Sequence, residues 1–290
     1  MPAILLKPPM QLFLSLARAL QVGALALTCT VLAGPTLAQT TASAPAEGSR
    51  PDWEGAVGLI AHHSPNYIGA AGSAWHLNPG LFVRYGRFSL TNNGGFVTRR
   101  DDDVERGVAA ELLRSETLRV SLSARFDGGR DAGSDAALRG LPDLRATVRA
   151  RLSAVQQLGA GWRLNLGLSP DLLGRGGGTT LDAGVVHEWR LSPSLLASAG
   201  VGGTWADKTY HQNYFGITAA QSLASGHRVY LPGAGLRDVS ASAGLRIALG
   251  PQWLGFAGLS ASALQGPALD SPLTQRRRNW GSNAGLAWRF

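Results

Sequence analysis

Serine and histidine are the side chains in this sequence that could act as nucleophile and general base in hydrolysis. His211 with Ser222, and His227 with Ser225, are close enough along the chain to be weighed as such pairs. Both pairs fall in one predicted loop, and no acidic side chain is placed to orient either histidine, as this chemistry requires. We therefore expect no catalytic residues, and a lipid hydrolase is the least favoured function.

Metal and phosphate sites also receive little support. His62 and His63 are adjacent, so on a strand they would face opposite ways, and no carboxylate cluster adjoins them. An exposed pair in a loop is the favoured interpretation. The glycine-rich segment 174–178 lacks the Lys-Ser/Thr ending and the following helix of a phosphate-binding loop. The sequence thus predicts no metal site, no cofactor and a flexible loop at 174–178.

Two runs of charge leave alternatives open. Residues 101–103 are three aspartates, which could bind divalent cations or simply be solvated. Residues 276–278 are three arginines, which could pair with lipopolysaccharide phosphates or form an exposed loop. The formal net charge of +8 favours anionic partners, while the export signal described below argues against nucleic acid.

Most other arginines alternate with apolar residues, which is the pattern of a strand with two different faces. Between positions 144 and 154, even positions hold Leu, Ala or Val and odd positions hold Arg, Thr or Ser. Arginine on a lipid-facing surface costs about 2–4 kcal/mol, so these side chains must face a barrel interior. The arginines predicted to line that interior are Arg119, Arg125, Arg145, Arg149, Arg151, Arg163, Arg190 and Arg246.

This polar face has two interpretations, because it also carries Asp127, Asp182, Glu188 and Asp238. An anion-attracting lumen would make the chain a narrow, porin-like channel for small anionic solutes. An arginine–carboxylate network would instead fill a closed interior. The excess of arginine slightly favours the basic lumen.

The elements that position these residues are predicted from a hydrophobic period of two, with no competing helical period. The predicted strands span residues 53–61, 76–85, 87–93, 104–113, 116–127, 143–155, 161–170, 180–190, 194–206, 237–249, 252–263 and 279–290. Short connections alternate with long ones, as the periplasmic turns and external loops of outer-membrane barrels do. Tryptophans fall near the strand ends, where membrane interfaces would lie. We predict an all-β fold, an antiparallel transmembrane β-barrel of about twelve strands, with ten as the alternative.

Composition agrees with this fold. Hydrophobic residues make up 44% of the chain and charged residues 16%, and mean hydropathy is +0.01. That is too polar for a helical membrane protein and low in charge for a soluble domain. We divide the chain into a signal peptide at 1–38, a flexible periplasmic lead-in at 39–52 and the barrel at 53–290. The only cysteine, Cys29, lies in the predicted signal peptide, so no disulfide is expected in the barrel.

Several different short motifs follow one another in a specific order along residues 52–290. One reads Ser64-Pro65-Asn66-Tyr67-Ile68-Gly69, another Tyr214-Phe215-Gly216, and a third Asp270-Ser271-Pro272-Leu273, with further matches at 125–127, 138–143, 205–207 and 230–235. In this order they resemble the MipA/OmpV family of outer-membrane proteins. The positions that carry the resemblance are Ser64, Pro65, Tyr67, Gly69, Tyr214, Phe215, Gly216, Ser271 and Pro272. The ending of the chain, with Trp288 and a terminal Phe290, is similar to the strand that the barrel-assembly machinery reads in many outer-membrane barrels.

The resemblance implies a location in the cell outer membrane of a Gram-negative bacterium, among outer-membrane lipid and lipopolysaccharide. It also implies a scaffold that joins a murein-degrading lytic transglycosylase to a murein-synthesising penicillin-binding protein in envelope biogenesis. Other members of the family are similar to porins, which keeps the narrow channel as an alternative function.

Overall fold

The β-sheet of this protein closes on itself through hydrogen bonds between its first and last strands. The computed structural model describes residues 53–92 and 106–290, and within these ranges twelve antiparallel strands form one closed barrel. Each strand pairs with the strands before and after it in the chain, and β1 pairs with β12. Pairing of β1 with β12 joins the first strand to the last, as an antiparallel sheet that crosses lipid requires.

The strands are β1 (Trp53–Pro65), β2 (Ser73–Tyr85), β3 (Phe88–Thr91), β4 (Gly107–Arg114), β5 (Leu118–Asp127), β6 (Thr147–Gly159), β7 (Trp162–Pro170), β8 (Thr179–Arg190), β9 (Leu195–Ala206), β10 (Gly235–Ala248), β11 (Trp253–Leu264) and β12 (Arg278–Arg289). This number confirms the prediction of twelve strands, and the ten-stranded alternative is wrong. The predicted signal peptide 1–38, the lead-in 39–52 and the aspartate run 101–103 lie outside the described residues.

Strand register shows why the alternation in the sequence matters. Leu152 of β6 pairs with Leu168 of β7, and Ser153 pairs with Gly167. Paired residues of an antiparallel ladder point to the same face, so the leucines share one face and the serine lies on the other. Leu152 is 44% exposed whereas Ser153 is 5% exposed. Apolar side chains therefore cover the outside of the barrel, and polar side chains point to its interior.

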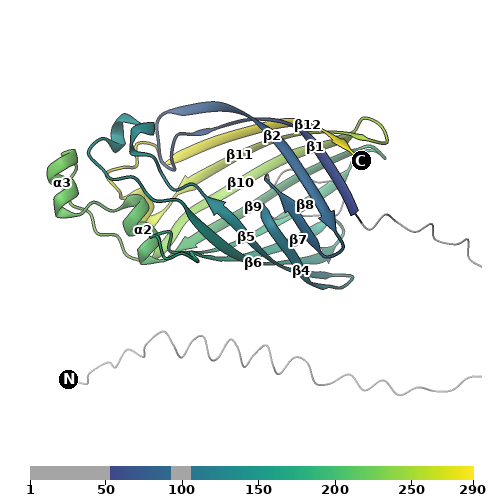
Figure 1. Ribbon diagram of the computed structural model, residues 1–290, viewed down its shortest axis with the longest axis horizontal. Coiled ribbons are helices and arrows are strands. Elements are labelled where there is room, and N and C mark those ends of the chain that lie inside the picture. The colour runs from purple at the N-terminus through teal and green to yellow at the C-terminus, as the bar shows by residue number, and fades with distance from the viewer. Residues whose placement is uncertain (1–52, 93–105) are drawn as a thin grey trace, which may run out of the picture. The chain divides into compact units, whose positions relative to one another are not determined.

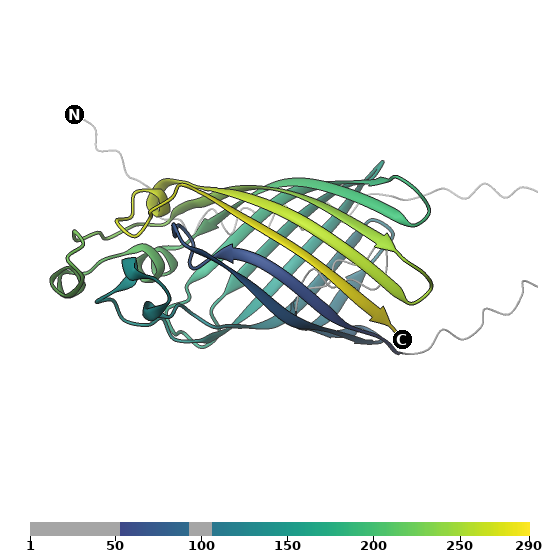
Figure 2. The same cartoon turned by 90° about the horizontal axis from the view of Figure 1, so that it is seen from above.

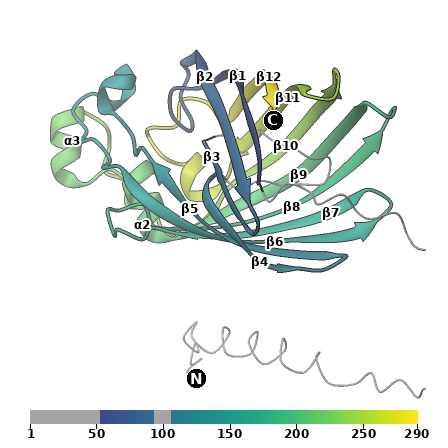
Figure 3. The ribbon, with the colours of Figure 1, turned by 45° about the vertical axis from the view of Figure 1, so that its right-hand side comes forward.

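Connections differ at the two ends of the barrel. The connections at one end, such as residues 160–161 and 191–194, are short turns, and the C-terminus lies at this end (Figure 1). The long connections gather at the other end, where they carry the short helices (Figure 3). These are η1 (Ala132–Ser134), η2 (Ala136–Leu138), α2 (Lys208–Phe215), α3 (Ala219–Ser225) and α4 (Gly266–Leu269). We call these the turn end and the loop end.

The helices α2 and α3 were not predicted, although the sequence carries start signals for both. Asp207 accepts a hydrogen bond from the backbone N–H of Tyr210, which caps α2. Thr218 and Gln221 form a reciprocal capping box that begins α3, and Gly226 ends that helix in the left-handed conformation. Each helix has only seven or eight residues. No helix among the described residues is long and apolar enough to cross a membrane.

The strands are tilted, and β1 runs beside β12 along the seam where the barrel closes (Figure 2). All eight tryptophans lie within the strands, at or close to an end, as expected for two interfacial belts. Part of the interior beside the seam is filled by an apolar cluster. Its buried members are Ala56, Ile60, Phe82, Leu254 and Ala287.

Candidate functional site

Ion pairs dominate the inward face of strands β4 to β8. The guanidinium of Arg149 on β6 is 2% exposed and donates to Asp127 of β5 at 2.6 Å. Arg151, two residues further along β6, holds Asp182 of β8 through two hydrogen bonds of 2.5 and 2.8 Å. Bidentate guanidinium–carboxylate contacts are among the strongest side-chain hydrogen bonds. The charges of the two arginines at the centre of the predicted basic face are therefore balanced by carboxylates of β5 and β8.

The same arrangement continues toward the turn end. Arg163 of β7 pairs with Glu188 of β8 at 2.7 Å, and Arg119 of β5 pairs with Glu111 of β4 at 3.4 Å. The strand registers also place Arg125, Arg190 and Arg246 at inward positions. Sequence reasoning missed Glu111 as a partner, because alternation assigns a side chain to a face but does not show which groups meet across strands. We call the ion-paired inward face of β4 to β8 the arginine wall.

Arg145 is the one arginine of the predicted set that does not lie on a strand. It precedes β6, whose first residue is Thr147, and its side chain is exposed. The prediction was wrong here because β6 begins four residues later than expected, so the alternating pattern in the sequence continues beyond the strand.

The glycine-rich segment 174–178 holds an arginine. Arg149 donates to the backbone carbonyls of Gly177 at 2.5 Å and Gly178 at 3.2 Å. Gly178 has a φ of +59°, and a Cβ there would lie 2.3 Å from the backbone nitrogen of Tyr210, so only glycine fits. Asp171 accepts from the N–H of Gly177 at 2.8 Å and fixes the segment. These contacts give the predicted flexible loop a defined structural role.

Helix α2 packs onto the arginine wall from the loop end. The ring of Tyr210 lies between two guanidinium groups, with its centroid 5.6 Å from Arg149 and 5.3 Å from Arg237. Arg237 also donates to the Tyr210 hydroxyl at 2.8 Å and pairs with Asp238 at 2.5 Å. A register shift between β9 and β10 at Arg237 turns this side chain toward the helix. The wall therefore also supports the loop end of the barrel.

The motifs that carry the family resemblance converge in the loops of this end. Tyr67 donates to the carbonyl of Leu273 at 2.8 Å, and Ser271 donates to the carbonyl of Phe215 at 2.6 Å. Leu273 and Phe215 are 0% and 1% exposed. Burial, with a smaller effect of the nearby Asp135 carboxylate, raises the pKa of Tyr67 to about 12, so its hydroxyl stays a donor. We call these packed loops the cap.

The core of the cap is apolar. One buried cluster consists of Ala206, Tyr210, Phe215, Leu264 and Ala268. A second consists of Leu138, Leu141, Ile217 and Leu273. Residues from three long connections, 128–146, 207–234 and 265–277, or their adjoining strand ends thus bury one another, although these segments are far apart in sequence.

The serine–histidine pairs do not form hydrolytic sites. His211 is completely buried between Tyr210 and Phe215, and burial, aided by Arg237, lowers its pKa. The Nε2 atom of His227 lies 2.9 Å from the backbone carbonyl oxygen of Ala137, in hydrogen-bond contact with the cap. Among the described residues no hydrogen bond joins either histidine side chain to a serine hydroxyl. The chemistry that these residue types suggested has no geometry to support it there.

The remaining histidines have structural surroundings. His62 points inward and stacks on His76, with ring centroids 4.9 Å apart. His63 faces the other way, with its Nε2 2.9 Å from the Ser73 hydroxyl. Both lie within β1, so the prediction of a loop pair was wrong, because β1 continues to Pro65. Within the described part of the chain no group of three or more histidine, cysteine or acidic residues could hold a metal ion.

His187 lies on the outer face of β8 between two tryptophans, as its position in the alternation predicted. Its ring centroid is 4.5 Å from that of Trp162 and 4.4 Å from that of Trp189. Its Nε2 lies 3.0 Å from the carbonyl oxygen of Ala160. This histidine belongs to the aromatic belt near the turn end.

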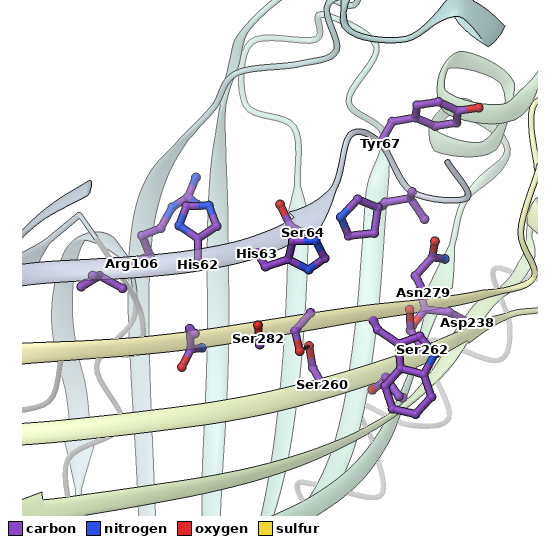
Figure 4. A pocket seen from close by; sticks show the side chains of 18 of the residues that line it. His62, His63, Ser64, Tyr67, Arg106, Asp238, Ser260, Ser262, Asn279 and Ser282 are labelled. Atoms are coloured by element: carbon purple, nitrogen blue, oxygen red, sulfur yellow. Dashed lines mark hydrogen bonds between the residues drawn. The ribbon is translucent and has the colours of Figure 1, made fainter. Parts of the chain in front are cut away.

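Two of the cavities formed by the described residues lie inside the barrel. The larger, about 680 Å³, lies toward the loop end and is lined by β1 with its following loop and by β10 to β12 (Figure 4). The smaller, about 500 Å³, lies toward the turn end and is lined by Arg114, Arg119, Arg163, Glu188 and Arg190. The apolar cluster and the ion pairs occupy interior space between the ends.

Comparison with known proteins identifies the family. The profile of the family described as "MltA-interacting protein MipA" matches residues 57–290. This chain belongs to the MipA family. No curated protein matches it.

Solved structures resemble this MipA-family chain in the architecture of the barrel alone. KdgM porin is 7% identical over 81% of this chain and 99% of its own, with a TM-score of 0.40. OmpT of Vibrio cholerae is 7% identical over 82% and 97%, with a TM-score of 0.36, and the channel DcaP of Acinetobacter baumannii is 6% identical over 82% and 96%, also at 0.36. The protein is an outer-membrane β-barrel, so the predicted family, fold class and location are confirmed.

The turn end should face the periplasm, because outer-membrane barrels have short periplasmic turns and longer external loops. Leu223 on α3 is 91% exposed, and Gln252 is exposed in the turn between β10 and β11. We expect Leu223→Cys to react with a membrane-impermeant maleimide on intact cells, and Gln252→Cys to react only after permeabilisation. Labelling of Gln252→Cys alone on intact cells would invert the orientation of this MipA-family barrel.

Proposed function

We propose that this MipA-family barrel is a non-catalytic interaction protein. It would hold a lytic transglycosylase, and with it a penicillin-binding protein, at the inner surface of the outer membrane. The observation that carries the proposal is the match of residues 57–290 to a family described as MltA-interacting. In this role the barrel would anchor murein-degrading and murein-synthesising enzymes in peptidoglycan biogenesis, and would itself perform no reaction.

The interior of the barrel supports an anchoring role over a channel. The arginines at the centre of the lumen are paired with carboxylates, so the field that would attract an anion is largely cancelled. The packed cap at the loop end adds a rigid, buried structure where a channel would need an entrance. Ion pairs that fix the positions of neighbouring strands suit a barrel whose surface must stay constant for a partner.

A narrow channel for small anionic solutes stays the second candidate. It is favoured by the cavity of about 500 Å³ at the turn end, where Arg114 and Arg190 contribute basic side chains. Planar-bilayer conductance distinguishes the two functions. A scaffold should give no ion-selective openings, whereas a basic channel should pass anions preferentially.

The surface that faces the periplasm is the place to test for partner binding. Arg114 is 51% exposed at the end of β4, and Arg190 is exposed at the end of β8. An arginine pair at one end of the barrel could attract an acidic surface on a partner enzyme, and reversing rim charges slows association. The turns themselves are short, so the contact would include the rim of the barrel.

We expect the tagged full-length barrel, solubilised from membranes, to capture a purified lytic transglycosylase. The double variant Arg114→Glu/Arg190→Glu should lower capture about tenfold, which corresponds to about 1.4 kcal/mol. The matched control is Arg276→Glu, an exposed arginine of the loop end, which should leave capture unchanged. Wild-type barrel that captures neither a transglycosylase nor a penicillin-binding protein would rule out the scaffold.

A further inference from the structure

The larger cavity of the barrel has a lining unlike that of the arginine wall. It encloses about 680 Å³, which lies within the range of about 300–1,000 Å³ that is typical of small-ligand sites. Inward positions of β10 to β12 supply hydroxyl and carboxamide groups to it. These are Ser240, Ser260, Ser262, Asn279 and Asn283.

The arginines and the aspartate of the lining are already engaged by the protein. Arg237 and Asp238 pair with each other at 2.5 Å. Arg106 donates to the backbone carbonyl of Phe126 at 2.9 Å. The inner surface of the cavity therefore presents neutral donors and acceptors, and it lacks the guanidinium–carboxylate pairs that fill the opposite side of the barrel.

Asn279 is the group that points to a ligand. It lies at the start of β12, opposite Ser262 in the register, and its side chain lines the cavity (Figure 4). The residue is only 8% exposed, yet neither its amide nitrogen nor its amide oxygen has a hydrogen-bond partner among the residues described. Buried polar groups are almost always satisfied by protein, water or ligand, and both amide atoms are shielded from solvent, so a turn of this side chain toward the cavity would let the carboxamide bond to a donor and an acceptor from outside the chain.

Other lining groups could complete the same contacts. Ser260 and Ser262 follow the alternation of β11 on the inward face, two residues apart, and Asn283 lies four residues after Asn279 on β12. Phe256 and Ile60 add an apolar surface at the side of the cavity. A ring that carries hydroxyl groups on its edge and C–H groups on its face matches this combination of surfaces.

We propose that this cavity binds a neutral saccharide of one or two rings, with the Asn279 carboxamide as the central contact. The hydroxyls of Ser260 and Ser262 and the amide of Asn283 would bond to further sugar hydroxyls, and Phe256 would pack against an apolar ring face. The site is independent of the proposed scaffold role, because it lies inside the barrel and toward the loop end. A uronic acid should bind more weakly than the matching neutral hexose, because the two arginines of the described lining are already held by Asp238 and by the Phe126 carbonyl.

The proposal is tested by calorimetric titration of the full-length barrel, purified in an amine-oxide detergent so that no sugar-headed detergent competes. The probes are glucose, N-acetylglucosamine, maltose and glucuronate. Saturable binding of at least one neutral probe is expected, with affinity reduced at least tenfold in Asn279→Ala. The matched control is Asn165→Ala, because Asn165 also faces inward, on β7, but does not line this cavity.

Heat-dependent migration on a gel checks that each variant is folded. If Asn279→Ala does not assemble, Ser262→Ala replaces it, because Ser262 faces Asn279 across the strand pair and should also weaken binding. The proposal is overturned if no neutral probe binds the wild-type barrel. It is also overturned if glucuronate alone binds, or if Asn165→Ala weakens binding as much as the cavity variant does.

Discussion

Replacing Arg149 with glutamine should destabilise the barrel strongly and leave its conductance unchanged. The side chain is 2% exposed, and it donates hydrogen bonds to Asp127 and to two glycine carbonyls of segment 174–178. Its guanidinium also makes a cation–π contact with the ring of Tyr210. Glutamine cannot make these contacts, and Asp127 is left without its counter-charge. Breaking a buried ion pair in this way costs on the order of 3–5 kcal/mol.

Urea unfolding in lipid vesicles, followed by tryptophan fluorescence, measures this loss. Arg145→Gln is the matched control, because Arg145 carries the same charge four residues earlier but is exposed and precedes β6. Its effect should stay within about 0.5 kcal/mol. A double variant with Asp127→Asn should lose less than the sum of the two single variants, since both remove one interaction.

The same experiment decides between the two interpretations of the basic face. An Arg149→Gln barrel that keeps its stability while its anion preference falls would mean that Arg149 lines an open, water-filled lumen. The structure favours the other outcome, because the Arg149 side chain is buried and its guanidinium bonds to the Asp127 carboxylate and to the carbonyls of Gly177 and Gly178.

The sequence was sufficient to predict the barrel because alternation is a strong local signal. A hydrophobic period of two does not match the 3.6-residue turn of a helix, so it indicates strands. In an exported protein, strands with one apolar face are expected to turn that face toward membrane lipid. Even the short β3 lies within the predicted strand 87–93, although alternation is weak there. Strand ends were predicted less accurately. Because β6 was expected to begin at residue 143, Arg145 was assigned to the barrel interior although it precedes the strand.

The candidate site could be predicted only in part, because its contacts join residues that are far apart in sequence. Alternation placed Arg149 and Arg151 on the inward face, but it cannot show which carboxylate meets which guanidinium across two strands. The motif residues Tyr67, Phe215 and Ser271 could be recognised as a set, but their meeting in the cap depends on the closed barrel. Asn279 falls at the start of the predicted strand 279–290, but its unsatisfied amide is a property of its surroundings that the sequence does not reveal.

Deletion of Phe290 should abolish assembly of the barrel while export continues. Its backbone N–H donates to the carbonyl of Gly55 at 3.0 Å, and its carbonyl accepts from the N–H of Gly55 at 3.1 Å. Its ring lies 5.6 Å from that of Trp53 and 5.3 Å from that of Trp288. The last residue therefore joins β12 to β1 at the turn end, where the barrel closes.

Gly55 shows how closely this end is packed. A Cβ at Gly55 would lie 2.6 Å from the ring of Phe290, so glycine allows the ring to lie across the first strand. Gly55→Val should then displace the ring and lower stability, although the C-terminal residue itself is unchanged. This variant separates the contribution of the closed seam from the reading of the last strand by the assembly machinery.

Heat-dependent gel migration of outer-membrane fractions measures the outcome. Deletion of Phe290 and Phe290→Asp should both remove the folded band, because lost ladder bonds at a membrane edge cost several kcal/mol each and a charge cannot replace the ring. Phe290→Trp should keep the band, and Trp189→Ala is the matched control, since Trp189 is an exposed aromatic residue near the turn end of β8, away from the β1–β12 seam. If the deletion variant migrates like the wild-type barrel, neither the seam contacts nor the terminal aromatic residue directs assembly. If Gly55→Val assembles normally and only the deletion fails, Phe290 acts through the assembly machinery rather than through the seam.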